Sequence, residues 1–150
     1  MSATHLRRRK LLAAAGALLL VRAANATPES LAAAMLDFTG GAEVKPGKVQ
    51  LDVAPLVDNG NTVPVTISAA AAESAGVRAT TIALFNQRNP ESHVVVFTLG
   101  PRSAKALVST RIRLATSQTL VAVARMSDGS YWSHAVDVIV TLAACIEGVD

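Results

Sequence analysis

The chain has 150 residues, of which 51% are hydrophobic and 17% charged, and this length and composition fit one globular domain with its own core. Its formal net charge is +3 and its sequence pI is about 9.5, but its aromatic content is only 3%. That content is too low for the stacking surfaces with which proteins bind single-stranded nucleic acids.

The first 26 residues have the features of an export signal. A basic start (HLRRRKLL) precedes the apolar run LLAAAGALLLV and the small residues ANA, which are typical of a cleavage site. The apolar run is too short to span a bilayer comfortably. Arg8-Arg9-Lys10-Leu11-Leu12 is similar to the twin-arginine export pattern, and an ordinary secretory signal is the alternative. We expect residues 1–26 to be the export signal and residues 27–150 to be a periplasmic domain with no membrane partner.

Removing this leader reverses the sign of the net charge. The leader holds no acidic residue, and its five basic residues are Arg7, Arg8, Arg9, Lys10 and Arg22, so the net charge falls from +3 to −2. The high pI therefore belongs to the leader and not to the domain, and we expect no nucleic-acid partner.

A short helix and seven strands are predicted in the mature chain. Leu31, Met35 and Phe38 follow Pro28 at near-helical spacing, and the stretch TGG (39–41) ends the helix. From Lys48 onward the hydrophobic period changes to two, which is typical of strands with one buried face. The predicted strands cover residues 48–53, 62–68, 80–86, 93–99, 106–114, 119–126 and 131–142.

Seven strands at roughly ten-residue spacing predict an all-β, immunoglobulin-like antiparallel sandwich. Asp128-Gly129 is a hairpin signal that makes the last two strands antiparallel neighbours. The stretch PLVDNGN (55–61) predicts a turn in which Asn59-Gly60 takes a positive φ at low cost. Pro64 predicts that its strand is an edge strand or contains a bulge, because proline cannot donate to a ladder.

The residues give little support to catalysis. His93 and His134 lie in predicted strands without a second ligand at metal-binding spacing, so we interpret them as strand residues with a satisfied ring nitrogen. The sequence contains no HExxH motif, paired-cysteine zinc pattern, phosphate-binding glycine loop or nucleophile elbow. We expect a non-catalytic protein with no metal site and no cofactor.

Cys145 is the only cysteine in the chain. Because disulfides form in the compartment that receives exported bacterial proteins, this cysteine is either buried, or free and reactive, or paired with another molecule. In the last predicted strand, Asp137, Thr141 and Cys145 share the polar parity. The apolar parity comprises Trp132, His134, Val136, Val138, Val140, Leu142 and Ala144. An unbroken strand therefore directs Cys145 toward solvent, where an unpaired thiol is reactive.

Three longer stretches and the C-terminal cysteine carry a family resemblance. The stretches are VDNGNTVPVTIS (57–68), LFNQRNP (84–90) and VSTRIRLATSQTLVAVARMSDGSYW (108–132). Together they resemble the SoxY family, the sulfur-carrier subunits of the bacterial thiosulfate-oxidising Sox system, from about Asp52 to Cys145. An immunoglobulin-like sandwich, twin-arginine export and a terminal cysteine all fit that family.

The resemblance implies that Cys145 is a covalent attachment point for sulfur. In the family, a c-type cytochrome oxidatively joins thiosulfate to the cysteine, a dimanganese hydrolase releases the terminal sulfone as sulfate, and a sulfane dehydrogenase oxidises the remaining sulfur. The carrier catalyses none of these steps. It works as a heterodimer with SoxZ, a second β-sandwich subunit, so the implied partners are a SoxZ-like subunit and these three enzymes.

The carrier arm departs from the family pattern Gly-Gly-Cys-Gly-Gly. Its residues beside Cys145 are Ala143, Ala144, Ile146, Glu147 and Gly148. Side chains restrict the backbone relative to glycine, and a β-branched residue is especially stiff. The acidic residues of the last four positions favour the neutral thiol and repel a thiosulfate dianion. A sulfur carrier is the leading hypothesis, and the alternative is a SoxY-like interaction subunit that binds a SoxZ-like partner without sulfur transfer.

Overall fold

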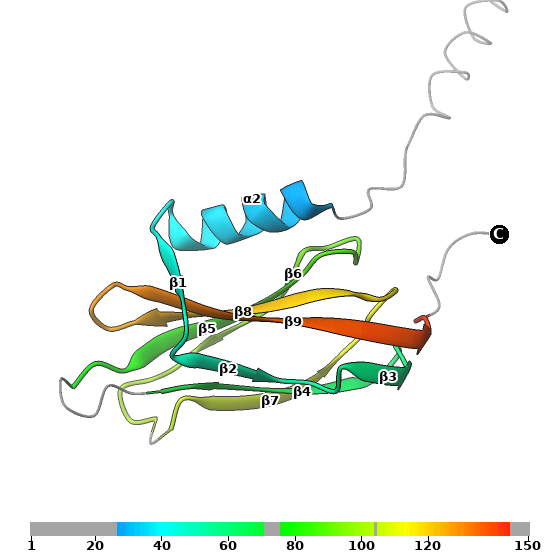
Figure 1. Cartoon of the computed structure of the whole chain (residues 1–150). Helices are drawn as coiled ribbons and strands as arrows, with labels where there is room; N and C mark the ends of the chain where they lie inside the picture. Colours follow the sequence, from blue (N-terminus) through cyan, green and yellow to red (C-terminus); the bar gives the residue numbers. More distant parts are fainter. Residues whose placement is uncertain (1–26, 71–75, 104, 145–150) are drawn as a thin grey trace, which may run out of the picture.

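The computed structural model describes residues 27–70, 76–103 and 105–144. In these ranges the chain forms one helix and nine strands, which are arranged as two packed sheets (Figure 1). The elements are α2 (Pro28–Thr39), β1 (Val44–Pro46), β2 (Val49–Asp52), β3 (Leu56–Asn59), β4 (Val63–Ala69), β5 (Ala79–Asn86), β6 (His93–Thr98), β7 (Leu107–Ile112), β8 (Gln118–Met126) and β9 (Tyr131–Leu142). The predicted β-sandwich with a short N-terminal helix is confirmed. The described part of the chain contains no helix that is long and apolar enough to cross a membrane.

The larger sheet has the order β1-β9-β8-β5-β6, with β3 also paired to β9, and the smaller sheet has the order β2-β4-β7. The main core fills the space between them and includes Ile67, Ile82, Leu120 and Val138. The core forms because strands with period-two alternation bury one face, as β4 does with every second residue. The predicted hairpin is confirmed, because β8 and β9 are antiparallel and Gly129 has a φ of 84° in their turn.

Helix α2 covers the outer face of the larger sheet (Figure 1). Thr27 caps its first turn by accepting a hydrogen bond from a backbone amide, and Gly40 ends it in the left-handed conformation. The ring of Phe38 meets Phe85 and Tyr131 edge-on, with centroid distances of 5.7 and 5.9 Å. A second, smaller core therefore lies beneath the helix.

The predicted turn at 55–61 is only partly a turn. Leu56–Asn59 form β3, which runs parallel to the end of β9 and pairs Leu56 with Ile139. The sequence prediction was wrong here because β3 is held by a strand far along the chain and shows no local alternation. The three-residue β1 was missed for the same reason, since it also pairs in parallel with β9.

Pro64 does not mark an edge strand, so that prediction was wrong. Its strand, β4, is the middle strand of the smaller sheet. However, β2 pairs only with Thr66–Ala69, and Pro64 has a ladder partner on one side alone, Arg111 in β7. The proline is tolerated because the ladder on its other side has already ended.

The predicted phase of β9 holds on the inner face, with one exception. Val138 is buried, and alternate residues on the same parity pack against the main core. Leu142 shares that parity but is 61% exposed. The other parity does not face solvent throughout, because Tyr131 is buried beneath α2. The alternation within β9 could not show that α2 covers the start of this strand.

Candidate functional site

The chain is fixed to the sandwich immediately before Cys145. Ala144 is only 8% exposed, and its backbone amide donates a hydrogen bond to the carbonyl oxygen of Leu114 at 3.1 Å. The Leu114 amide donates to the Gly60 carbonyl at 2.8 Å, and the Gly60 amide donates to Leu142, also at 2.8 Å. We call Gly60, Leu114 and Ala144 the root. It joins the end of β9 to the segments that follow β3 and β7.

Gly60 is required at the root because the backbones approach closely. It is not among the glycines with positive φ, so the backbone role predicted for it was wrong. A β-carbon at this position would lie 2.9 Å from the Ala144 amide nitrogen and 3.0 Å from Cγ1 of Val140, and it would collide with the Leu114 carbonyl oxygen. Two of these neighbours are backbone atoms, which cannot rotate away. Only glycine fits without displacing the chain.

A polar side chain holds both neighbours of Leu114. Asn89 donates through Nδ2 to the Arg113 carbonyl at 2.7 Å and accepts through Oδ1 from the Ala115 amide at 3.0 Å. The same Oδ1 accepts a hydrogen bond from Nε2 of Gln118 at 2.7 Å. The Leu114 carbonyl, which is the acceptor at the root, is therefore flanked by two anchored backbone groups.

The network continues into the turn between β5 and β6. Oε1 of Gln118 accepts from the Arg88 amide at 2.8 Å, and Oδ1 of Asn86 accepts from the Asn89 amide at 3.0 Å. Asn86 is 1% exposed and also donates to the Glu91 carbonyl at 2.9 Å. Among the described residues, no buried side-chain nitrogen or oxygen lacks a partner. A fully satisfied buried network is rigid, so two turns brace the root.

Sequence reasoning assigned Asn89 and Gln118 to turns and Asn86 to the end of a strand, and it did not bring the three together. Asn86 and Asn89 lie in the stretch LFNQRNP, and Gln118 lies in the stretch 108–132, so two of the three stretches that carried the family resemblance contain part of the network. That resemblance covers these residues but did not single them out. Their partners are backbone groups in another turn, and no spacing rule predicts such a contact.

The structure describes two of the predicted arm residues. Ala143 is exposed, and Ala144 is buried at the root. Cys145, Ile146, Glu147 and Gly148 lie outside the described residues, as does the predicted export signal at 1–26.

Both histidines of the described chain make contacts within the fold. Nδ1 of His134 accepts a hydrogen bond from the Leu51 amide at 3.0 Å and so connects β9 to β2, which confirms the interpretation of this residue. The His93 ring instead stacks on Phe85 with a centroid distance of 4.9 Å. Within 27–70, 76–103 and 105–144, no three His, Cys, Asp or Glu side chains group together as metal ligands.

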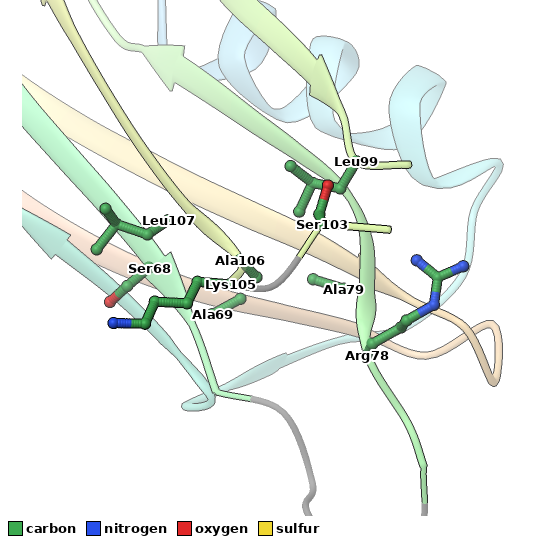
Figure 2. Close-up of a pocket in the computed structure, with 9 residues that line it drawn as sticks. All are labelled: Ser68, Ala69, Arg78, Ala79, Leu99, Ser103, Lys105, Ala106 and Leu107. Carbon is green, nitrogen blue, oxygen red and sulfur yellow. The ribbon is translucent and has the colours of Figure 1, made fainter. Parts of the chain in front are cut away.

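A pocket of about 310 Å³ lies at the end of the sandwich away from the root (Figure 2). Its charged groups do not converge, because the Lys105 amino group and the Arg78 guanidinium point to opposite sides. Arg78 instead donates to the Gly100 carbonyl at 3.4 Å. Ser68 and Ser103 also line the pocket, but its lining includes no histidine and no carboxylate.

One family model decides the assignment of the chain. The model described as "Sulfur oxidation protein SoxY" matches residues 35–145, a range that contains the root, the amide network and Cys145. The chain belongs to the SoxY family. Membership of the SoxY family confirms the resemblance and connects the protein to sulfur oxidation. No curated protein gives a significant match.

Solved structures similar to this SoxY family member include superoxide reductases. The superoxide reductase (neelaredoxin) from Ignicoccus hospitalis has a TM-score of 0.54 and 14% identity, covering 77% of this chain and 94% of that one. The superoxide reductase from Nanoarchaeum equitans has a TM-score of 0.53 and 9% identity, covering 64% of this chain and 100% of that one. At these identities the likeness concerns the fold alone.

Proposed function

We propose that this SoxY family member is a sulfur carrier that holds sulfur intermediates covalently on Cys145 and presents them to partner enzymes. The observation that carries the proposal is the root. The sandwich holds the backbone as far as Ala144, the residue before the sole thiol of the chain. The SoxY match extends to Cys145 itself. In this proposal the chain supplies the thiol, and other proteins supply the catalysis.

The proposed cycle begins with an oxidative step. The Cys145 thiolate and thiosulfate form a sulfur–sulfur bond and pass two electrons to a c-type cytochrome, which gives the adduct Cys–S–S–SO3⁻. A hydrolase then adds water to the sulfone and releases sulfate and two protons, leaving Cys–S–S⁻ for a sulfane dehydrogenase. A SoxZ-like subunit completes the carrier as a heterodimer in the periplasm.

An exposed apolar patch beside the root supports the binding of a partner protein. Leu56 and Ile139 are paired between β3 and β9 and are 57% and 60% exposed. Neighbouring exposed apolar side chains are typical of protein–protein contacts. The patch also favours a second candidate function, an interaction subunit that binds a SoxZ-like partner without sulfur transfer.

Intact mass spectrometry distinguishes the two functions. The mature protein, purified with its partner, is exposed to thiosulfate and the conjugating cytochrome. A carrier gains a thiosulfonate adduct that Cys145→Ser does not form, whereas an unmodified wild-type chain overturns the carrier function. A stable heterodimer that survives Cys145→Ser, together with no adduct on the wild type, favours the interaction subunit.

A further inference from the structure

The open side of the sandwich contains a groove near the root. β6 and β7 are the edge strands of their sheets, and a groove of about 580 Å³ runs between them. Residues 110–113 line one side, and Asn86, Asn89 and the residues that begin β6 line the other. The amide network described above therefore borders the groove and also holds the root.

Two arginines make this groove basic. Arg111 lies near the end of β7 and Arg113 directly follows the strand, and both are exposed. Neither lies within ion-pair distance of a carboxylate in the described ranges, where the recorded ion pair is Lys45–Glu43. Glu91 is the one acidic residue in the lining, and the His93 ring is stacked on Phe85. The lining thus includes two arginines and one acidic residue.

The groove is connected to the thiol through the root. Arg113 directly precedes Leu114, the acceptor for the Ala144 amide, and Asn89 fixes the Arg113 carbonyl. Cys145 directly follows Ala144, and successive α-carbons are about 3.8 Å apart. Arg113 is thus one residue from the acceptor that holds Ala144, and Ala144 is the residue before the thiol.

We infer that Arg111 and Arg113 form a binding site for a sulfur oxyanion. The ligand is the sulfonate end of a species carried on Cys145, or a free thiosulfate ion, and the first source rests on the proposed function. A planar guanidinium group donates paired hydrogen bonds to an oxyanion, which suits it to this class of ligand.

The first test loads the cysteine without any partner enzyme. Tetrathionate converts the Cys145 thiolate to Cys–S–S–SO3⁻ and releases thiosulfate, so one sulfur–sulfur bond forms and one breaks. The comparison sample is the full mature chain whose Cys145 is alkylated with iodoacetamide, which adds a neutral group. We expect the anionic adduct alone to shift the side-chain NH resonances of Arg111 and Arg113 in ¹⁵N NMR spectra and to raise the unfolding midpoint.

The second test uses the free ion. Thiosulfate is titrated into the Cys145→Ser protein while the same arginine resonances are followed. Saturable shifts identify a site that accepts the free ion, and shifts confined to the tetrathionate-loaded protein identify the cysteine-borne adduct as the ligand. Either result supports the binding site, and the pair of results decides the source.

Charge-matched variants distinguish a specific binding site from general electrostatic attraction between the protein and the anion. In Arg111→Gln/Arg113→Gln we expect thiosulfate to bind about tenfold more weakly or the adduct-dependent rise in midpoint to be lost. Arg102→Gln/Lys105→Gln removes two exposed cations at the other end of the sandwich and should leave both effects intact. If neither the adduct nor free thiosulfate gives an effect that depends on Arg111 and Arg113, the inference is overturned. Failure of the cytochrome to conjugate thiosulfate would contradict the carrier function but not this site.

Discussion

The carbonyl oxygen of Leu114 accepts the backbone amide of Ala144 at 3.1 Å, directly before the only cysteine of the chain. Leu114 is buried and follows β7, whereas Ala144 follows β9. The position at which the cysteine leaves the sandwich is therefore fixed by two segments that are distant in sequence. Substitutions of the residues around Leu114 can therefore test how this end of the sandwich is held together.

Gly60→Ala should destabilise the protein by about 1–3 kcal/mol, the usual cost of overpacking. The added β-carbon meets the backbone of Leu114 and Ala144, so relief requires one of these segments to move. Urea unfolding followed by circular dichroism measures the change. Gly100→Ala is the matched control, because a β-carbon there meets nothing within 4 Å. Equal stability of the two variants would contradict the close approach at Gly60.

Ala144→Pro removes the amide that donates to Leu114 and adds little side-chain volume. We expect a loss of about 1 kcal/mol in the free energy of unfolding, which is the typical net value of one hydrogen bond. The neighbouring Ala143→Pro is the control, since Ala143 is exposed and its amide has no recorded backbone bond within the described part of the chain. A larger loss for Ala143→Pro would show that proline strain, and not the hydrogen bond, dominates.

Asn89→Ala should cost about 2 kcal/mol or more, because it leaves the Arg113 carbonyl, the Ala115 amide and the Gln118 amide group without their partner. Thermal or denaturant unfolding measures this loss. Asn61→Ala is the comparison, since its side chain bonds only locally, to Asn59 at 3.1 Å, and exposed substitutions usually change stability by about 0.5 kcal/mol or less. Similar values for both variants would disprove the bracing role of Asn89.

Replacing Ile146 and Glu147 by glycine should speed conjugation of thiosulfate to Cys145. The change removes a β-branched residue and a negative charge from the positions after the thiol. The rate of adduct formation with the conjugating cytochrome is followed by intact mass spectrometry. Glu147→Gln alone separates charge from stiffness, because it keeps the side-chain length. If all three proteins react at the same rate, neither property limits conjugation.

Hydrophobic alternation predicted the fold because most strands bury one face locally. The β8–β9 hairpin followed from Asp128-Gly129, and the end of α2 followed from the glycines after Thr39. In contrast, β1 and β3 are short parallel additions to β9, and their stability depends on a partner that no local pattern reveals. The burial of Tyr131 likewise depends on a helix that precedes it by many residues.

The candidate site was predictable only in part, for a similar reason. The solitary Cys145 and the family resemblance identified the position of the thiol. The root and the amide network consist of contacts between backbone groups and turn residues, such as Asn89 with Arg113. Sequence spacing carries no information about which turn lies opposite another. Gly60 illustrates this, since the sequence suggested a positive φ, whereas the structure requires glycine because the backbones of Leu114 and Ala144 lie close to it.

The anchoring of Ala144 limits how deep an enzyme's catalytic cavity can be. With that hydrogen bond intact, the α-carbon of Cys145 is about 3.8 Å from that of Ala144, so only one residue separates the anchored backbone from the thiol. Partners with shallow cavities can then accept the sulfur from the folded end of the sandwich. An enzyme with a long access tunnel must instead break the Ala144–Leu114 bond and draw Ala143 and Ala144 away from the sheet.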